Sequence, residues 1–293
     1  MQSESGLKRT TWGDWFIVFL MILLIILCIL PILNVAATAF SSTEAVQRQQ
    51  VAFLPVGFQT QSVMTVLSDT RFMQSLAWTA TLTVMVVIIN LTMTVLLAYP
   101  LTYMTLKGRK IISFYVVFTM LFSAGLIPAF VLFRNLNLID NPLVLILPGM
   151  ISVFNMVIIR NFFLGIPDSL RESAEMDGAG PMTVLLKIYL PLSTPVLATV
   201  GLFYGVGRWN GFQDALFFLT GAPDWHPIQL LLFNILNNIV AVDPLDPGAS
   251  MPPGWGQTIE SAAIVVATAP ILAVYPFLQK YFVQGATLGA VKG

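Results

Sequence analysis

Long apolar runs dominate the sequence, and their length is the first clue to the fold. Each of six segments holds roughly 20 or more mainly apolar residues, the length needed to cross the ~30 Å hydrocarbon core of a bilayer as a helix. These segments are Trp15–Val35, Phe72–Tyr99, Ile111–Phe133, Leu143–Phe163, Thr194–Leu219 and Ile259–Phe282. Membrane β-strands would alternate over about ten residues, whereas these runs are apolar in every register. The pattern predicts an all-α membrane protein with six transmembrane helices in a single domain, residues 1–293.

The composition supports a membrane protein and excludes several other classes. Hydrophobic residues make up 57% of the chain and charged residues 10%, where a soluble domain carries about 25% charged residues. Fourteen basic residues balance fourteen acidic ones, so no basic excess indicates a nucleic-acid partner. The single cysteine, Cys28, and the single histidine, His226, provide neither an internal disulfide nor a histidine metal cluster. We therefore expect no metal site, no cofactor and no catalytic centre in this chain.

The basic residues indicate how the spans are oriented. Lys8 and Arg9 precede the first run and Ala37-Thr38-Ala39 follows it, an arrangement that also suits a cleaved secretory signal. The run has the length of a full span, which favours an uncleaved first helix that starts in the cytoplasm. Lys and Arg are enriched in cytoplasmic loops, and with both termini inside, ten basic residues lie inside and three outside, with Arg208 within the fifth span. The inside set is Lys8, Arg9, Lys107, Arg109, Lys110, Arg160, Arg171, Lys187, Lys280 and Lys292, and the outside set is Arg48, Arg71 and Arg134. We predict a multi-pass membrane protein with both termini cytoplasmic.

The long external loop, residues 220–258, contains no Lys or Arg. Its apolar segment Ile228–Leu236 is too short to span and predicts a short helix on the membrane surface or against the other helices. The residues Asp243–Gly248 are rich in Pro and Gly and predict irregular turns. We interpret this segment as a connecting loop.

The cytoplasmic loop, residues 164–192, has the signals of two short helices with a sharp break. Ser169 and Glu172 have the spacing of a capping box, and Gly178 suits the left-handed residue that ends a helix. Pro181 suits the first position of the next helix, and Pro191 marks its end. Such a compact loop makes a good docking element for a partner. The alternative is an ordinary cytoplasmic loop.

The residues of this loop resemble the EAA loop of permease subunits of binding-protein-dependent ABC importers. The pattern is Glu-Ala-Ala, three residues, Gly, and then a spaced Ile-x-Leu-Pro. Here it reads Glu172-Ser173-Ala174, Asp177-Gly178-Ala179 and Ile188-Tyr189-Leu190-Pro191, with Ser173 as the one departure. The resemblance continues in Phe122–Pro128, in the turn Leu138–Asp140, and in Gln279–Gly285 and Leu288–Gly293. It favours the carbohydrate branch, similar to the small maltose permease subunit, and within it importers of uronate-containing saccharides such as alginate.

The resemblance implies that several protein chains carry out transport together. The EAA loop would be a coupling helix held by a cytoplasmic ATPase, through Glu172, Ser173, Ala174, Met176, Asp177, Gly178 and Ala179. The tail would reach into the ATPase dimer through Gly289, Ala290, Val291 and Lys292; the alternative is an unstructured terminus. The implied partners are a second homologous permease, an ATP-binding cassette ATPase dimer and an external sugar-binding protein. The chain lacks a Gly-x-x-x-x-Gly-Lys-Ser/Thr loop, so ATP and magnesium are expected on the partner ATPase.

The fifth predicted span contains the best candidates for a substrate path. A charge near the middle of a span costs several kcal/mol and normally faces a cavity or a partner charge. On a continuous helix with about 100° per residue, one face is shared by Trp209, Asn210, Gln213 and Asp214, and Arg208 lies roughly 120° from Asp214. An aromatic ring can stack on a sugar, amides can bind its hydroxyls, and a guanidinium can pair with a uronate carboxylate. The predicted path residues are Arg208, Trp209, Asn210 and Gln213, with Asn155 of the fourth span as a weaker candidate.

Other interpretations of the same residues remain open. Arg208 could hold a neighbouring helix through a carbonyl or an acid, and the glycines around it could merely allow close packing. A self-contained secondary transporter would need carboxylates in its spans for a coupling ion, and Asp214 is the one clear central candidate. A membrane enzyme is least favoured, because His226 has no evident nucleophile or metal partner.

Overall fold

The computed structural model describes residues 12–237 and 256–290, with the backbone alone from 275 onward. All regular structure in these ranges is helical, as the apolar runs predict. The chain divides into two compact units, residues 1–69 with 238–266 and residues 70–237 with 267–293. Each unit is described by itself.

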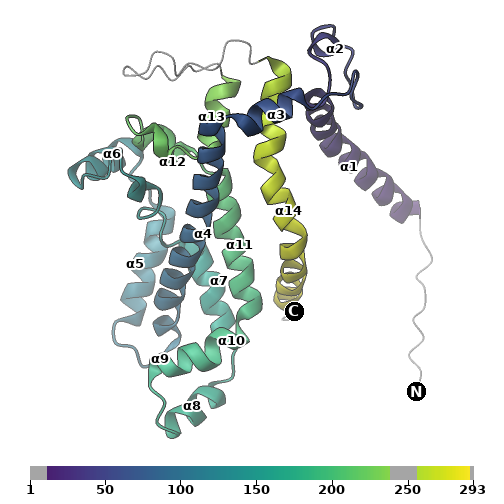
Figure 1. Cartoon of the computed structure of the whole chain (residues 1–293). Coiled ribbons are helices and arrows are strands. Elements are labelled where there is room, and N and C mark those ends of the chain that lie inside the picture. The colour runs from purple at the N-terminus through teal and green to yellow at the C-terminus, as the bar shows by residue number, and fades with distance from the viewer. Residues whose placement is uncertain (1–11, 238–255, 291–293) are drawn as a thin grey trace. The chain divides into compact units, whose positions relative to one another are not determined.

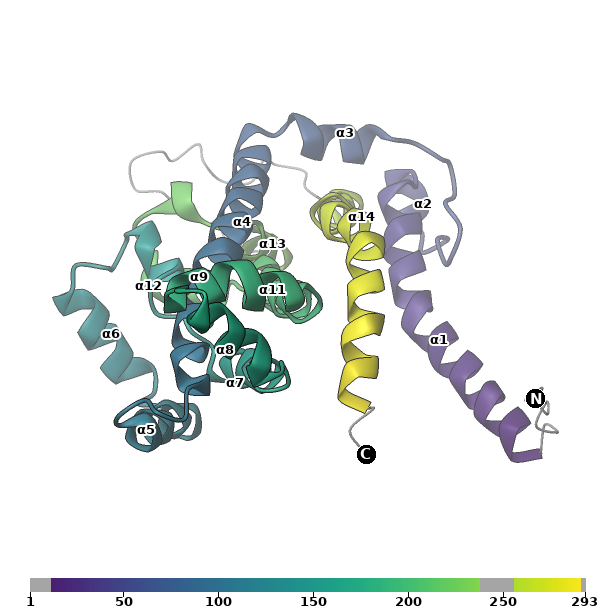
Figure 2. The ribbon, with the colours of Figure 1, turned by 90° about the horizontal axis from the view of Figure 1, so that it is seen from below.

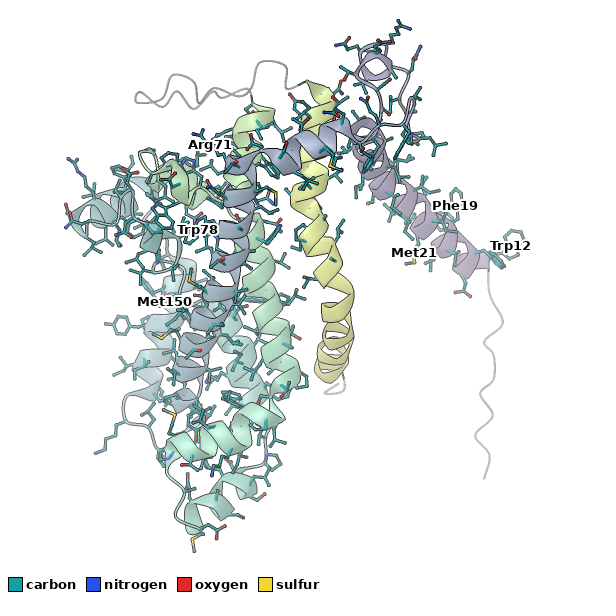
Figure 3. All side chains as sticks on the ribbon, viewed as in Figure 1. Trp12, Phe19, Met21, Arg71, Trp78 and Met150 are labelled. Carbon is teal, nitrogen blue, oxygen red and sulfur yellow. The ribbon has the colours of Figure 1, made fainter. Side chains whose placement is uncertain are left out.

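The first unit begins with α1 (Trp12–Ala39), a helix of 28 residues that is exposed along most of its length. Large apolar side chains such as Trp12, Phe19 and Met21 project from it (Figure 3). An exposed apolar helix of this length fits a lipid environment. Its last turn, residues 37–39, is buried, so the Ala-Thr-Ala sequence that resembles a cleavage site forms the packed end of a helix.

The segment after α1 folds back onto the end of that helix. It contains α2 (Thr43–Gln47) and leads to α3 (Gln61–Ser68). The Ser41 hydroxyl donates to the carbonyl of Ala37 at 2.6 Å and accepts the amide of Val56 at 3.0 Å. The second bond joins residues 15 positions apart, and the two together fix the path of the loop.

The second unit is built on three packed helices, α4 (Thr70–Ala98), α7 (Val153–Phe163) and α11 (Thr194–Asn210) (Figures 1 and 2). Glycines allow α11 to approach α4 closely. A Cβ atom on Gly205 would lie 3.4 Å from Cγ2 of Val87, and one on Gly201 would lie 3.7 Å from Cγ1 of the same residue. Small residues at such contacts let two membrane helices pack by van der Waals attraction.

The remaining helices of the second unit lie around this core. They are η1 (Pro100–Thr102), α5 (Arg109–Leu121), α6 (Leu126–Asn135), η2 (Pro142–Leu145), α8 (Asp168–Met176), α9 (Pro181–Val184), the π-helical turn η3 (Leu185–Tyr189), α10 (Leu190–Leu192), α12 (Gln213–Phe218), η4 (Pro223–Trp225) and α13 (Ile228–Leu236). The last helix of the chain is α14 (Gln257–Ala290), which the division at residue 266 splits between the two units.

Only some of the six predicted spans are single helices in the described part of the chain. Three helical segments are long and apolar enough to cross a membrane: Trp12–Ala39, Thr70–Thr102 and Gln257–Val274. Three further candidates are bent pairs: α5 with α6 at 116°, α7 with α8 at 74°, and residues 181–192 with α11 at 84°. The count is therefore three, or up to six if each bent pair is one span.

The helix breaks are corrections to the predicted spans. The run Ile111–Phe133 breaks before Gly125, which has a φ of +84°. The run Leu143–Phe163 is helical only at its two ends, and the run Thr194–Leu219 breaks between Asn210 and Gln213. The hydropathy pattern does not reveal these breaks, because it depends on the side chains and not on whether the backbone is helical.

The predicted short helix of the long loop is α13, and it packs against α4. The amide of Ile228 donates to the Thr79 hydroxyl at 2.7 Å, and the Ser75 hydroxyl donates to the carbonyl of His226 at 2.7 Å. Four apolar residues of α13 are buried. The packed alternative is thus the one adopted, whereas residues 238–255 of the loop, with Asp243–Gly248, lie outside the described residues.

Candidate functional site

The loop at residues 164–192 has a preformed break between its two helices. After α8, Gly178 takes a left-handed φ of +82°. The amide of Gly178 donates to the carbonyl of Glu175 at 3.0 Å, and the amide of Ala179 donates to the carbonyl of Ala174 at 2.9 Å. This pair of bonds is a Schellman motif. Pro181 then occupies the first turn of α9, so both signals read from the sequence are confirmed.

The predicted capping box at the start of this loop is wrong. Helix α8 begins at Asp168, and the residue before it, Pro167, makes no side-chain capping bond. Ser169 therefore lies inside the first turn and not in the cap position. Asp168 instead places a carboxylate near the helix N-terminus, where the helix dipole favours negative charge, and it pairs with Arg171 at 3.0 Å.

The residues that match the EAA pattern divide into an exposed and an inward set. Ala174 and Ala179 pack against the hydrophobic core, which explains why small residues suit these positions. The exposed set is Glu172, Ser173, Met176, Asp177 and Gly178. Met176 is 88% exposed, so α8 and its C-cap residue present the acidic Glu172 and Asp177 and the Met176 thioether at the surface.

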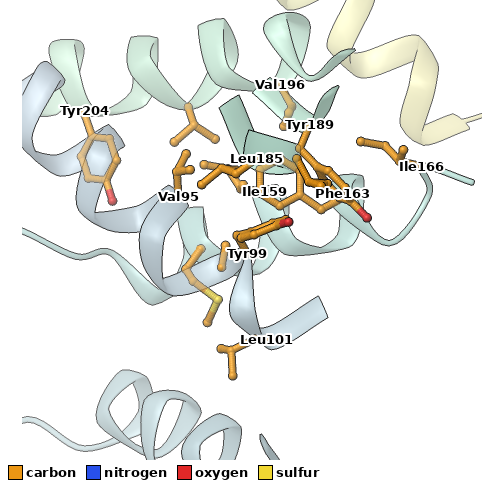
Figure 4. Close-up of a cluster of buried hydrophobic side chains, with 14 residues drawn as sticks. Val95, Tyr99, Leu101, Ile159, Phe163, Ile166, Leu185, Tyr189, Val196 and Tyr204 are labelled. Carbon is orange, nitrogen blue, oxygen red and sulfur yellow. The ribbon is translucent and has the colours of Figure 1, made fainter. Parts of the chain in front are cut away.

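An aromatic cluster holds the two ends of the loop together (Figure 4). Phe163 is the last residue of α7, and Tyr189 closes the π-helical turn. Their ring centroids are 5.4 Å apart, and Tyr99 at the end of α4 lies 5.1 Å from Tyr189 and 6.3 Å from Phe163. All three contacts are edge-to-face, the arrangement that aromatic quadrupoles favour, and all three residues are buried. The loop is thus anchored at both ends to α4.

The predicted contact residues of the tail are described only in part. Gly289 and Ala290 form the end of α14, so the helix continues further than a flexible tail would. Val291 and Lys292 lie outside the described residues.

A cavity of about 340 Å³ lies between α4, α7, α11 and α12. The polar residues on its wall are Asn90, Ser152, Asn155, Tyr204, Arg208 and Asp214. The Tyr204 hydroxyl lies 2.7 Å from that of Thr94 and accepts the amide of Ser152 at 3.0 Å. The Asn90 amide group donates to the carbonyl of Gly149 at 2.9 Å. The volume of the cavity and its mixed polar and apolar wall are typical of a small-ligand site.

The Arg208 side chain bridges the break in the fifth predicted span. Its guanidinium donates two hydrogen bonds to the Asp214 carboxylate, at 2.5 and 3.2 Å, across the interrupted backbone. It also donates to the carbonyls of Gly211 at 2.8 Å and Leu145 at 3.3 Å. The Arg208 side chain is 7% exposed. The 120° separation predicted for Arg208 and Asp214 is wrong, because the helix is not continuous between them.

The structure separates the five predicted path residues. Arg208 and Asn155 line the cavity. Trp209 is buried, and its indole nitrogen has no hydrogen-bond partner within the described part of the chain. Asn210 and Gln213 are exposed, and none of these last three is on the cavity wall. The shared face predicted for them depended on the continuous helix.

Sequence reasoning gave no path role to three polar wall residues, Asn90, Ser152 and Tyr204. Tyr204 gave no signal, because a tyrosine in an apolar span is unremarkable in a hydropathy pattern. Asn90 was visible as a lone amide in the second span. Its hydrogen bond to the carbonyl of Gly149 is enough to explain an amide at this position.

The fold and these features define a class of protein, and comparisons with known proteins agree with them. Residues 97–287, more than half of the chain, match the family of binding-protein-dependent transport system inner membrane components. The chain belongs to this family, whose members are transport subunits and not enzymes. The resemblance to permeases of ABC carbohydrate importers, read from the EAA loop, is thereby confirmed.

Individual relatives carry the comparison further. The chain is 41% identical to the polygalacturonan/rhamnogalacturonan transport system permease protein YtcP of Bacillus subtilis (strain 168), over 88% of this chain and 91% of that protein. It is 28% identical to the arabinooligosaccharides transport system permease protein AraQ of Halalkalibacterium halodurans, over 72% of this chain and 71% of that protein. It also resembles a chain in the crystal structure of a bacterial ABC transporter involved in the import of the acidic polysaccharide alginate. The TM-score is 0.83 at 33% identity, covering 93% of this chain and 99% of the other.

Proposed function

We propose that this chain is one of two permease subunits of an ATP-driven importer of acidic oligosaccharides. It lies in the cell inner membrane, crosses it six times and has both termini in the cytoplasm. Its partners are a second homologous permease, an ATP-binding cassette ATPase dimer and an external sugar-binding protein. ATP and magnesium bind the ATPase, and this chain supplies the path and the contact that couples it to hydrolysis.

The observation that carries this proposal is the preformed, exposed helix α8. Its end is fixed by the Schellman motif at Gly178 and its base by the buried aromatic cluster. A docking element that is ordered beforehand loses little conformational entropy when its partner binds. We assign the exposed Glu172, Ser173, Met176 and Asp177 to the ATPase contact, with Ala174, Gly178 and Ala179 shaping the loop. The tail, Gly289 to Lys292, is assigned to a second contact with the ATPase dimer.

The preference for acidic substrates is supported by two relatives. Alginate is described as an acidic polysaccharide in the solved transporter, and polygalacturonan, in the name of the Bacillus protein, is a polymer of a sugar acid. A carboxylate-bearing substrate needs a positive group on its path, and Arg208 is a cation on the cavity wall.

We assign Arg208 and Asn155 to the substrate path at the cavity, and the exposed Asn210 and Gln213 to the part that the second permease completes. The buried Trp209 is assigned to the path as the residue next to Arg208. Because Asp214 already occupies the Arg208 guanidinium, a uronate carboxylate would have to replace Asp214 there. Such an exchange keeps the buried cation paired, which avoids the several kcal/mol cost of an unpaired buried charge, and it frees the Asp214 carboxylate, whose side chain is one-third exposed and can be solvated.

The experiment is an uptake assay with a uronate oligomer and a neutral oligomer of equal length. The wild-type importer should prefer the uronate oligomer. Arg208→Gln keeps much of the shape and removes the charge, so the preference should fall by the equivalent of about 1.5–3 kcal/mol, the scale of a charge-assisted hydrogen bond. Asn210→Ala, at an exposed position without a charge, should leave the charge preference in place. Equal losses for both oligomers in an assembled Arg208→Gln complex would show that Arg208 does not select for charge.

A further inference from the structure

The side of α8 that faces the rest of the protein is held by a charge on an aromatic ring. The guanidinium carbon of Arg171 lies 4.8 Å from the ring centroid of Tyr103, within the range of a cation–π contact. Arg171 also pairs with Asp168 at 3.0 Å and with Glu175 at 3.8 Å, one turn before and one turn after it. Its side chain is only 17% exposed, against 71% for Asp168. The two carboxylates thus hold the guanidinium against the tyrosine.

Tyr103 passes this contact to Tyr99, which lies deeper in the protein. The two hydroxyl oxygens are 2.6 Å apart, and the rings meet edge-to-face at 5.3 Å. The Tyr99 hydroxyl also donates to the carbonyl of Pro181, the first residue of α9, at 3.0 Å. Tyr103 therefore holds α8 and Tyr99 holds α9. Tyr99 directly follows α4, and Tyr103 directly follows the short turn η1.

The same helix α4 leads from these tyrosines to the cavity. Thr94 bonds the Tyr204 hydroxyl on α11, and Asn90, one turn further, is on the cavity wall. Thr94 and Asn90 thus lie along α4, a helix of 29 residues, and Tyr99 directly follows its last residue. A helix is stiff over this length, so a push at its end displaces residues along it.

We propose that Arg171 and Tyr103 are positioning residues that fix the coupling helix α8 to α4, so that movement imposed on α8 reaches the cavity wall through α4. This inference rests on the proposed function, in which an ATPase moves α8. It assigns α4, and not only the chain that directly follows the loop, to the transmission of that movement. Loss of the contact would let α8 move while α4 stays behind.

The test is the number of substrate molecules imported per ATP hydrolysed by the complete importer in vesicles. Tyr103→Leu removes the ring and should lower this ratio by about fivefold, the factor that corresponds to a contact of about 1 kcal/mol. Tyr103→Phe keeps the ring face and the edge-to-face contact with Tyr99 and loses only the hydroxyl contact, so it should lower the ratio by about twofold at most. Arg171→Gln should match Tyr103→Leu, and Arg171→Lys should retain part of the coupling. A residue that served folding alone would lower import and hydrolysis together and leave their ratio unchanged.

A double variant and a control variant test whether Arg171 and Tyr103 act through one shared contact. Arg171→Gln with Tyr103→Leu should be no worse than either single change, since both remove one contact. Tyr115→Leu, at an exposed tyrosine of α5, should leave the ratio at the wild-type value. If Tyr103→Leu assembles poorly, Arg171→Gln on the exposed α8 provides the same test.

Three results would overturn the inference alone: unchanged ratios in Tyr103→Leu and Arg171→Gln, equal damage by Tyr103→Phe and Tyr103→Leu, or effects that multiply in the double variant. A wild-type complex that shows no ATP-dependent import would overturn the proposed function, and this inference with it.

Discussion

At the scale of single residues, Arg208 and Asp214 form an ion pair across the interruption of the fifth predicted span. Gly211 and Phe212 interrupt the helix, and the guanidinium of Arg208 then reaches the carboxylate of Asp214 at 2.5 Å. A charge within an apolar span is costly unless it has a partner, and this pair supplies one. The same guanidinium holds the carbonyl of Leu145 and lies on the cavity wall, so Arg208 is both a packing contact and a wall residue.

This pair makes a stability prediction. Asp214→Asn leaves the buried Arg208 without its charge partner and should lower the free energy of unfolding by about 1–3 kcal/mol, less than for a fully buried pair because the Asp214 side chain is one-third exposed. Adding Arg208→Gln should recover part of that loss, which a double-mutant cycle on thermal unfolding of the purified protein measures. Asp224→Asn, at an exposed acid of η4, is the matched control and should change little. Strictly additive losses would mean that the two residues do not act as a pair.

At the scale of elements, the 164–192 loop was the most predictable part of the chain. Gly178 and Pro181 have local conformational preferences that do not depend on distant residues, so their positions were correct. The start of α8 was misplaced, since Ser169 and Asp168 both suit a helix start and spacing alone does not choose between them. The anchoring of the loop by Tyr99, Phe163 and Tyr189 was beyond the sequence, because those residues are 26 to 90 positions apart.

A substitution at Gly178 tests the role of the loop geometry. No atom lies within 4 Å of a Cβ built on Gly178, so Gly178→Val acts only through the left-handed φ of +82°, at a cost of about 1–2 kcal/mol. We expect a five- to thirtyfold loss of coupled ATP hydrolysis, the factor that corresponds to this free energy. Gly178→Asn should be milder, because Asn tolerates this conformation.

Gly180→Val is the control for that experiment, because Gly180 has an ordinary φ of −73° and equally open surroundings. It should retain coupled hydrolysis. Equal effects of the two valine variants would show that bulk at the surface of the loop matters and that its left-handed turn does not.

At the scale of the whole molecule, the sequence predicted the class of fold better than its details. Apolar length fixes an all-helical membrane chain, because an unpaired backbone cannot be exposed to lipid. The breaks at Gly125 and between Asn210 and Gln213 were missed, since hydropathy averages over a window and does not register a single turn of backbone. The cavity was predicted only through Arg208 and Asn155, because its other walls come from helices that meet in three dimensions. The family was predicted from the EAA pattern, because its residues lie close together in the sequence and can be recognised without a structure.

The central claim is that this chain imports acidic oligosaccharides by using ATP hydrolysed on a partner subunit. The most direct measurement is uptake of a labelled uronate oligomer into vesicles that contain the assembled importer and its binding protein, with ATP on the ATPase side. Uptake should require ATP and should fall sharply in the Gly178→Val complex, while Gly180→Val should transport normally. Uptake that continues without ATP and follows an ion gradient would contradict the account, and would favour a secondary transporter with Asp214 as its coupling carboxylate.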